Sequence, residues 1–235
     1  MKIGVVVLVR LSSKRLPRKA LRTIEAKEIL LYIIERLNRV LDKSNIIIAT
    51  SSDIEDDAIE KFARTHHLEV YRGSLNDVSQ RFYDAAARAG FDFATRINGD
   101  NVFVDINLLT EMIHIAEKNE YDFISNVKNR TYPKGMSIEI IRTSHYAQIL
   151  SAIKHSDYHK EHVTSYLYEN EEKGSYKFVL NNNLPDAAGI QLALDTQEDW
   201  VRTEKIIRAF KKHHWEYNLT EILPIWKSIQ NEKFV

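Results

Sequence analysis

Continuous apolar runs and amphipathic stretches alternate along the first 125 residues of the chain. The run from Ile3 to Val9 is apolar throughout, which is typical of a strand buried on both faces of a parallel sheet. The stretch from Glu28 to Leu41 instead spaces its apolar residues three and four apart, as an amphipathic helix does. The same alternation predicts further strands at 45–50, 68–71, 93–97 and 121–125 and helices at 54–65, 77–89 and 106–117. It indicates an α/β fold with a mostly parallel sheet and helices on both faces.

The alternation becomes irregular after residue 125. The pattern predicts strands at 137–142, 176–180 and 190–194, a helical region at 143–170, a long helix at 196–212 and a short last helix that begins near Thr220. No internal repeat, low-complexity tract or linker interrupts the sequence. We therefore expect a single domain over residues 1–235, in which residues 127–185 form a small α+β insertion.

The composition excludes several classes of protein and of catalytic site. The 235 residues contain no Cys, which excludes a disulfide scaffold, a thiolate zinc site and cysteine catalysis. No apolar run approaches the roughly 20 residues of a membrane span. The apolar start at Ile3 lacks a small-residue cleavage site and runs into a basic stretch, so a signal peptide is not expected. We expect a cytoplasmic protein without a membrane partner.

Positive charge is concentrated at the start of the chain. Lys and Arg balance Asp and Glu at 33 each, yet residues 1–27 hold eight Lys or Arg and one acid, Glu25. A protein that binds long nucleic acid usually carries a broader basic face. The confined charge therefore indicates a site for a compact polyanion, and no nucleic-acid partner is expected.

The basic loop from Arg10 to Lys19 directly follows the first predicted strand. Ligands of open α/β sheets bind beyond the carboxyl ends of the strands. The cationic side chains of this loop would offset the charge of a triphosphate, and Ser12 and Ser13 add hydroxyl donors. The loop has no glycine, so it is not a Walker A loop. The alternative interpretation is a solvated basic turn.

Two acidic residues follow predicted strands farther along the chain. Gly99 permits a tight turn that would deliver Asp100 to the sheet edge, and Asp195 ends the strand predicted at 190–194. Mg²⁺ prefers one or two protein carboxylates together with phosphate oxygens, so the two acids form a candidate metal site. The alternative for Asp100 is a plain Asn-Gly-Asp turn. Asp105 and Asp199 are explained as helix N-terminal residues.

Two weaker signals remain. His155, His159 and His162 are spaced four and three apart, which would place them on one helix face as a transition-metal site or, alternatively, as part of an exposed polar helix. Gly73 and Ser74 indicate a turn before the helix that starts at Asp77. That turn also lies near the same sheet edge, which leaves a nucleotide contact open.

The motif Arg10-x-x-Ser-x-Arg-Leu-Pro-x-Lys19 resembles the first motif of the sugar cytidylyltransferases that make CMP-Kdo and CMP-neuraminate. Over roughly residues 1–200 the chain is most similar to the spore-coat polysaccharide branch of that family. The segments that carry the rest of the resemblance are Tyr71–Val78, Gly99–Asn101, Tyr132–Gly135, Glu161–Thr164 and Leu194–Asp199. Arg18 departs from the pattern, since the Kdo and neuraminate branches carry Gly there.

The resemblance implies a Rossmann-like nucleotide-diphospho-sugar transferase fold. It also implies Mg²⁺-dependent transfer of CMP from CTP to a sugar acid or related small acceptor, with release of pyrophosphate, for surface glycan biosynthesis by a homodimer. The implied catalytic residues are Arg10, Arg15 and Lys19, and the implied metal ligands are Asp100 and Asp195. The implied nucleotide-binding residues are Leu8, Arg10, Ser12, Ser13, Arg15, Lys19, Ser74, Asp77, Arg81, Asn98 and Gly99. The resemblance also implies that the insertion at 127–185 binds the acceptor and forms the dimer contact, and the candidate acceptor-binding residues in it are Tyr132, Lys134, Glu139 and His162.

Two other functions compete with this one. A glycosyltransferase that consumes a nucleotide-sugar can share the fold, but it typically presents an Asp-x-Asp pair where this chain has Gly99-Asp100-Asn101. A non-catalytic nucleotide-binding module is the second alternative. Lys19, Asp100 and Asp195 together argue against that module.

Overall fold

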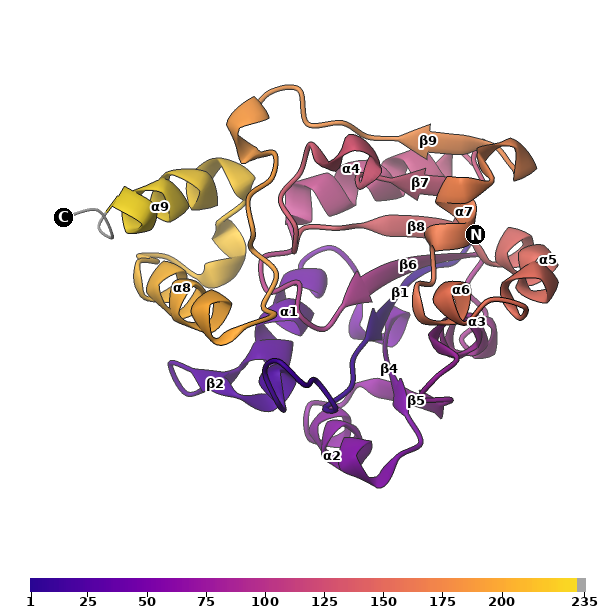
Figure 1. The fold of residues 1–235 in the computed structure, drawn as a ribbon, viewed down its shortest axis with the longest axis horizontal. Coiled ribbons are helices and arrows are strands. Elements are labelled where there is room, and N and C mark those ends of the chain that lie inside the picture. Colours follow the sequence, from indigo (N-terminus) through magenta and orange to yellow (C-terminus); the bar gives the residue numbers. More distant parts are fainter. Residues whose placement is uncertain (232–235) are drawn as a thin grey trace.

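In the computed structural model, which describes residues 1–231, seven strands form one sheet in the order β5-β4-β1-β6-β8-β7-β9 (Figure 1). The central strand β1 (Ile3–Leu8) pairs in parallel with β4 (Ile46–Ser51) and β6 (Phe93–Asn98). The other strands of the sheet are β5 (Glu69–Gly73), β7 (Phe123–Ser125), β8 (Glu139–Arg142) and β9 (Tyr176–Phe178). Only β8 runs antiparallel to its neighbours, so the predicted mostly parallel sheet is confirmed.

Helices cover both faces of this sheet because β1 is apolar on both sides. Val5 and Val7 pack into one apolar cluster with α1 (Ile29–Leu37), α2 (Asp57–Thr65) and α4 (Ile106–Glu117). Val6 and Leu8 pack into a second cluster with α3 (Val78–Arg88) and α5 (Thr143–Ile153). A continuous apolar strand therefore becomes the middle layer of three.

A third apolar cluster anchors the C-terminal part of the chain. In it α8 (Gln197–Arg208) and α9 (Leu219–Asn231) pack against α1 and against the segment that follows β6. The helix predicted at 196–212 thus ends earlier, and the last helix is longer than predicted. The small hairpin of β2 (Thr23–Ile24) and β3 (Lys27–Glu28) lies beside this cluster, below α8 in Figure 1.

The helical region predicted at 143–170 is three helices rather than one. After α5 the chain forms the short helices α6 (Asp157–Glu161) and α7 (Ser165–Glu169). Because β8 pairs between β6 and β7, residues 127–185 complete the main sheet. Single 3₁₀ turns lie at Lys19–Leu21, Lys43–Asn45, Ile54–Asp56, Lys128–Arg130, Glu171–Lys173, Pro185–Ala187 and His214–Glu216. Among the described residues, no helix combines the length and apolar character needed to cross a membrane.

The strand predicted at 190–194 is wrong. This segment forms a single bridge, between Gln191 and Lys134, and no ladder. Its alternating pattern arises because Ile190, Leu192 and Leu194 are buried in the third cluster. Alternating apolar and polar residues indicate that every second side chain is buried. An extended segment can bury its side chains in this way without pairing with a neighbouring strand.

A fully buried arginine joins the C-terminal part to the sheet. Arg36 of α1 donates to the backbone carbonyls of Val104 at 3.1 Å, Tyr217 at 2.8 Å and His214. Burial lowers the pKa of Arg36 to about 10, so the guanidinium stays charged at neutral pH. It supplies donors to three carbonyls from two distant segments, and so fixes the segment after β6 against the turn before α9.

We expect Arg36→Met to lower the free energy of unfolding by about 3 kcal/mol, because it leaves several buried carbonyls without donors. Urea unfolding measures this loss. The control is Arg39→Met, since Arg39 stacks on the ring of Trp215 at 3.9 Å and should cost about 1 kcal/mol or less. A loss no greater for Arg36→Met than for the control would contradict the role assigned to Arg36.

Candidate active site

A cavity of about 490 Å³ opens at the carboxyl ends of β1 and β6. Of the residues predicted to bind nucleotide, those that line it are Leu8, Arg10, Ser12, Ser13, Arg15, Lys19, Arg81, Asn98 and Gly99. The other two, Ser74 and Asp77, lie outside it. Asp77 caps α3 by accepting from the backbone N–H of Gln80, and the Ser74 hydroxyl accepts from the N–H of Asp77. Both therefore shape the turn before α3 instead of lining the cavity.

A buried carboxylate fixes the start of the basic loop. Asp56 accepts a hydrogen bond from the backbone N–H of Leu11 at 2.8 Å and another from the N–H of Ser51 at 3.1 Å. Leu11 and Leu16 are themselves buried, so the loop is anchored by apolar side chains while Arg10, Lys14, Arg15 and Lys19 line the cavity. Arg18 lines neither this cavity nor the one described below, and it adopts a left-handed backbone with φ of 55°.

Asp100 and Asp195 meet at the ammonium group of Lys19. The Lys19 Nζ lies 2.9 Å from Asp100 Oδ2 and 3.0 Å from Asp195 Oδ1, which places the two carboxylate oxygens within about 6 Å of each other. Arg15 reaches the same oxygen of Asp195 at 3.3 Å. The side chains of Lys19, Asp100 and Asp195 are 13%, 20% and 29% exposed, so these three groups are partly shielded from water, whereas Arg15 is exposed. Asp100 and Asp195 lie 81 and 176 positions from Lys19 in the sequence, yet the three side chains form one charged centre.

Backbone contacts hold Asp195 in this position even though it does not end a strand. The N–H of Leu194 donates to the backbone carbonyl of Asp100 at 3.1 Å. Thr196 and Asp199 form a capping box at the start of α8, and the N–H of Asp195 also donates to Asp199 Oδ2. Gly135, with φ of 95°, lets the segment pass closely, because a Cβ there would lie 2.3 Å from the backbone nitrogen of Ala193.

A second cavity, of about 570 Å³, adjoins the first. The residues that line both are Arg96, Asn98, Asp100, His162 and Asp195. The predicted acceptor residues Lys134, Glu139 and His162 line the second cavity, whereas Tyr132 lines neither. Tyr132 packs against the apolar clusters, and burial raises its pKa to about 12. Sequence position alone did not show that this tyrosine turns inward.

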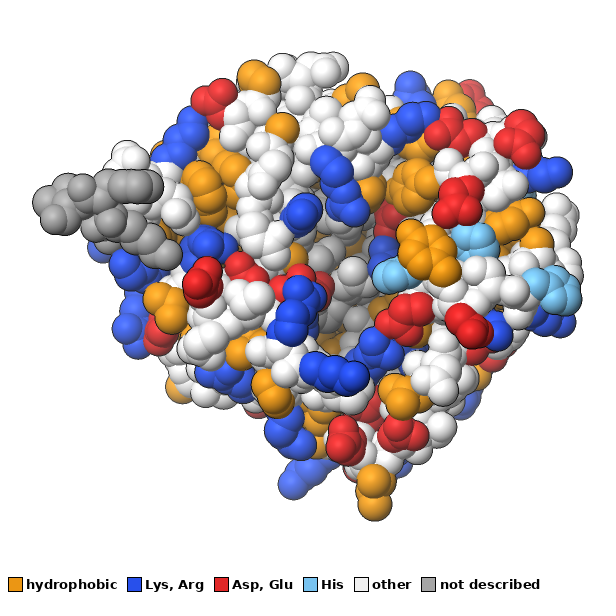
Figure 2. Space-filling view, viewed as in Figure 1, with side chains coloured by type: hydrophobic (Ala, Val, Ile, Leu, Met, Phe, Trp, Pro, Cys, Tyr) orange, Lys and Arg blue, Asp and Glu red, His pale blue; other side chains and the backbone are white. Residues whose placement is uncertain are grey.

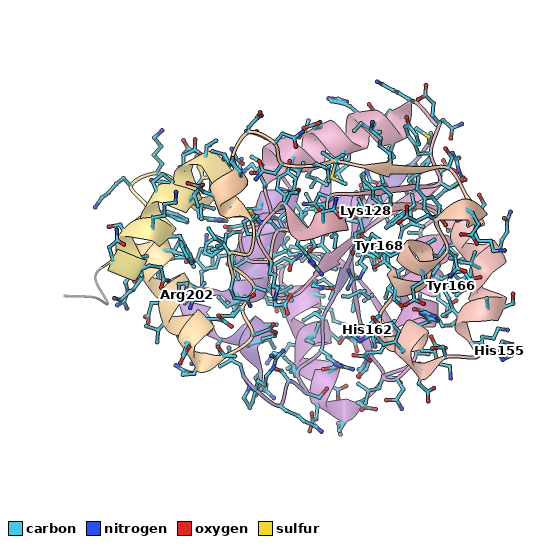
Figure 3. The ribbon with its side chains drawn as sticks, turned by 45° about the horizontal axis from the view of Figure 1, so that its top comes forward. Lys128, His155, His162, Tyr166, Tyr168 and Arg202 are labelled. Carbon is cyan, nitrogen blue, oxygen red and sulfur yellow. The ribbon has the colours of Figure 1, made fainter. Side chains whose placement is uncertain are left out.

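The walls of the second cavity are strongly polar. Glu139, 2% exposed, accepts hydrogen bonds from Arg96 and, at 2.7 Å, from the hydroxyl of Tyr168. Burial, and next to it the Glu139 charge, strongly raises the pKa of Tyr168. Figure 2 shows Lys and Arg side chains gathered around the hollow at the centre of this face, and Figure 3 labels Lys128 and Tyr168 near it.

The three histidines do not form a metal site. Among the described residues, no group of three or more His, Cys, Asp or Glu side chains is placed to hold a metal ion. His159 lies 2.8 Å from the hydroxyl of Ser165, and His155 lies away from His162 in Figure 3. The transition-metal hypothesis is therefore wrong.

Two wall residues were not singled out from the sequence. Arg96 is the one charged residue of the strand β6, which is a signal that could have identified it. Glu161 ends α6 and forms a salt bridge with Arg10 at 2.6 Å. Its place in the Glu161–Thr164 motif was visible, but its partner lies 151 positions away and depends on the fold.

Comparisons with known proteins show the family to which the chain belongs. A family model described as cytidylyltransferase matches residues 4–226. The chain is 29% identical over 201 residues to the spore coat polysaccharide biosynthesis protein SpsF of Bacillus subtilis, covering 83% of this chain and 82% of that protein. It is 25% identical over 130 residues to the 3-deoxy-manno-octulosonate cytidylyltransferase of Geobacter sulfurreducens, covering 55% of this chain and 51% of that protein.

A solved structure extends the agreement to the whole fold. A cytidylyltransferase from Leptospira borgpetersenii superposes with a TM-score of 0.90 at 30% identity, over 98% of this chain and 96% of that one. The predicted Rossmann-like nucleotide-diphospho-sugar transferase fold is thereby confirmed. Together with the basic loop that lines the first cavity, these matches establish that the chain belongs to the cytidylyltransferase family and is a nucleotidyltransferase.

Proposed function

We propose that this chain transfers CMP from CTP to a small anionic acceptor, with Mg²⁺ as cofactor, and releases pyrophosphate. The observation that carries the proposal is the junction of the two cavities at Asp100 and Asp195. One cavity offers a cationic loop to a triphosphate, and the other offers room for a sugar-sized acceptor. The two substrates would meet where the paired carboxylates lie.

The first cavity suits a nucleoside triphosphate. Arg10, Arg15 and Lys19 supply positive charge, and Ser12 and Ser13 supply hydroxyl donors along the same wall. In the same cavity Arg81 is 2% exposed, and its Nε has no hydrogen-bond partner within the described part of the chain. A buried donor without a partner favours a polar ligand beside it. CTP as that ligand rests on the family to which the chain belongs.

The residues present fit a divalent metal ion. Asp100 and Asp195 already share one cation, the Lys19 ammonium, with their oxygens within about 6 Å of each other. Mg²⁺ is usually held by one or two carboxylates together with substrate phosphates and water, so these two side chains would hold it. When bound, the metal would polarise phosphate oxygens as a Lewis acid.

The second cavity favours an acceptor with negative charge. Lys134 and Arg130 line it, and neither has a carboxylate within ion-pair distance among residues 1–231. Lys128, in contrast, is paired with Glu171 at 2.6 Å. Two free cations suit a carboxylate or phosphate group. A sugar acid, or a related compound used for surface glycans as the name of the SpsF relative indicates, satisfies this requirement.

The geometry supports in-line displacement at the α-phosphorus. The acceptor hydroxyl would approach from the second cavity while pyrophosphate leaves along the Arg10–Lys19 loop. Charge that develops on the phosphate oxygens would be stabilised by donors already in place, so catalysis depends on position and electrostatics. No covalent enzyme intermediate is required. A homodimer, which the resemblance implies, and a cytoplasmic location, which the composition favours, remain predictions.

We expect pyrophosphate release to depend on CTP and a sugar-acid acceptor with Mg²⁺, and to be much slower with ATP, GTP or UTP. Coupled pyrophosphate assays over a grid of nucleotides and acceptors measure this. In Lys19→Ala, kcat/KM should fall by about a hundredfold or more, the usual effect of losing one charged contact to the transition state.

The matched control for Lys19→Ala is Arg18→Gly. Arg18 is the adjacent cation, it lines neither cavity, and glycine adopts its left-handed backbone without strain. Arg18→Gly should keep turnover. Lys19→Ala activity within twofold of the original, or faster release with another nucleotide, would contradict the proposal.

We expect Gly135→Ala to reduce turnover by about a hundredfold, because its Cβ would push the 190–195 segment and displace Asp195. The control is Gly189→Ala. Gly189 shares a positive φ, of 77°, but a Cβ there would meet no atom within 4 Å. The Gly189→Ala variant should lower the free energy of unfolding by about 1 kcal/mol and leave turnover nearly unchanged. Equal turnover in both variants would show that Gly135 does not position Asp195.

A further inference from the structure

Glu161 binds the first cation of the triphosphate loop with both of its carboxylate oxygens. Arg10 Nη2 lies 2.6 Å from Glu161 Oε1, and Arg10 Nη1 lies 3.4 Å from Oε2. The two side chains are 36% and 39% exposed, so water and solutes reach the pair. Glu161 lines the nucleotide cavity and does not line the acceptor cavity. An acid therefore stands in the wall where the proposed ligand is itself an anion.

This acid differs from the other two that pair with the loop. Asp100 and Asp195 lie where the two cavities meet and suit a metal ion. Glu161 shares no cation with them. It also acts on the buried Arg81: burial mainly lowers the pKa of Arg81, Arg10 lowers it further, and Asp56 and then Glu161 oppose both. Glu161 thus lies among guanidinium groups, in the charge environment that a phosphate would occupy.

A carboxylate and a phosphate present the same kind of paired oxygen acceptors to an arginine. Arg10 cannot face Glu161 and a triphosphate with the same two N–H groups. We propose that Glu161 is an internal stand-in for phosphate, which holds Arg10 until the triphosphate displaces it. This inference rests on the proposed function of the nucleotide cavity and adds a role for a residue outside the predicted set.

The helix α6, which carries Glu161, also borders the acceptor cavity, so displacement of Glu161 from Arg10 would affect that cavity. Tyr158, within α6, lines the acceptor cavity, and His162, directly after α6, lines both cavities. None of the five residues of α6 is buried. The Ser79 hydroxyl donates to the His159 carbonyl at 2.6 Å, and His159 also contacts the Ser165 hydroxyl, so the Arg10 pair is one of several polar attachments of the helix. Loss of that pair on nucleotide binding would loosen α6 beside the acceptor cavity.

The first test is calorimetric binding of CTP, and of tripolyphosphate as the bare probe, in EDTA. Glu161→Gln should bind both about fivefold more tightly than the original chain, the change that corresponds to removing a half-exposed competing ion pair. In an Arg10→Ala background the same substitution should change affinity by less than twofold. Asp157→Asn removes an acid from the same helix that pairs with Lys160, and it should have no effect.

The outcomes separate this inference from the proposed function. CTP binding that Lys19→Ala weakens but Glu161→Gln does not tighten would overturn the inference alone. An equal gain in affinity from Glu161→Gln with Arg10 present and in the Arg10→Ala background would also overturn the inference. Glu161 would then act only by repelling the anionic ligand. Absence of CTP binding by the original chain, in EDTA and with Mg²⁺ alike, would overturn both.

Hydrogen exchange tests the connection to the acceptor cavity. The amides of residues 157–162 should exchange faster when tripolyphosphate binds the original chain. In Glu161→Gln they should exchange fast from the start and respond little to the probe. Unchanged exchange of α6 on binding, in a chain that binds the probe, would overturn the proposed exchange of partners. Melting temperatures of all variants confirm that each is folded, and Glu161→Ala provides a second variant with the same expectation.

Discussion

The ammonium group of Lys19 stabilises the candidate active site by contacting two acidic side chains that would otherwise repel each other. Asp100 and Asp195 lie within about 6 Å of each other, and two carboxylates at that distance repel by on the order of 3 kcal/mol at an effective dielectric constant near 20. Lys19 removes that repulsion by contacting both. A cation therefore offsets this repulsion, and under the proposed function a metal ion held by Asp100 and Asp195 would do so in place of the lysine. Lys19 would then be free to contact the phosphates of the nucleotide.

The rest of the fold serves to bring those two acids to one place. Asp100 follows a central strand, but Asp195 follows an extended segment that has no ladder of its own. Packing in the third apolar cluster, the close approach at Gly135 and the hydrogen bond from Leu194 to Asp100 replace the missing ladder. Arg36 then joins the C-terminal helices to the segment after β6. The C-terminal part is thus a component of the site.

The sequence predicted the layers and the basic loop because both depend on local order. A buried strand shows as an apolar run, and the loop cations are adjacent in the chain. The predictions were wrong or incomplete where contacts between residues far apart in the sequence determine the structure. The pattern at 190–194 is the same for a strand and for an extended buried segment, and nothing local shows that Tyr132 turns into the core. The pair of Arg10 with Glu161 was equally invisible, since 151 positions separate the partners.

The central claim is that Lys19 and a metal ion compete for the same two carboxylates. Titration with Mn²⁺, followed by electron paramagnetic resonance without nucleotide, measures this directly. If the claim holds, Lys19→Ala binds Mn²⁺ several-fold more tightly than the original chain, and Asp195→Asn in that background abolishes the gain. Arg18→Gly, which changes a cation outside both cavities, leaves the affinity unchanged. Mn²⁺ affinity that is equal or weaker in a folded Lys19→Ala variant would contradict the account.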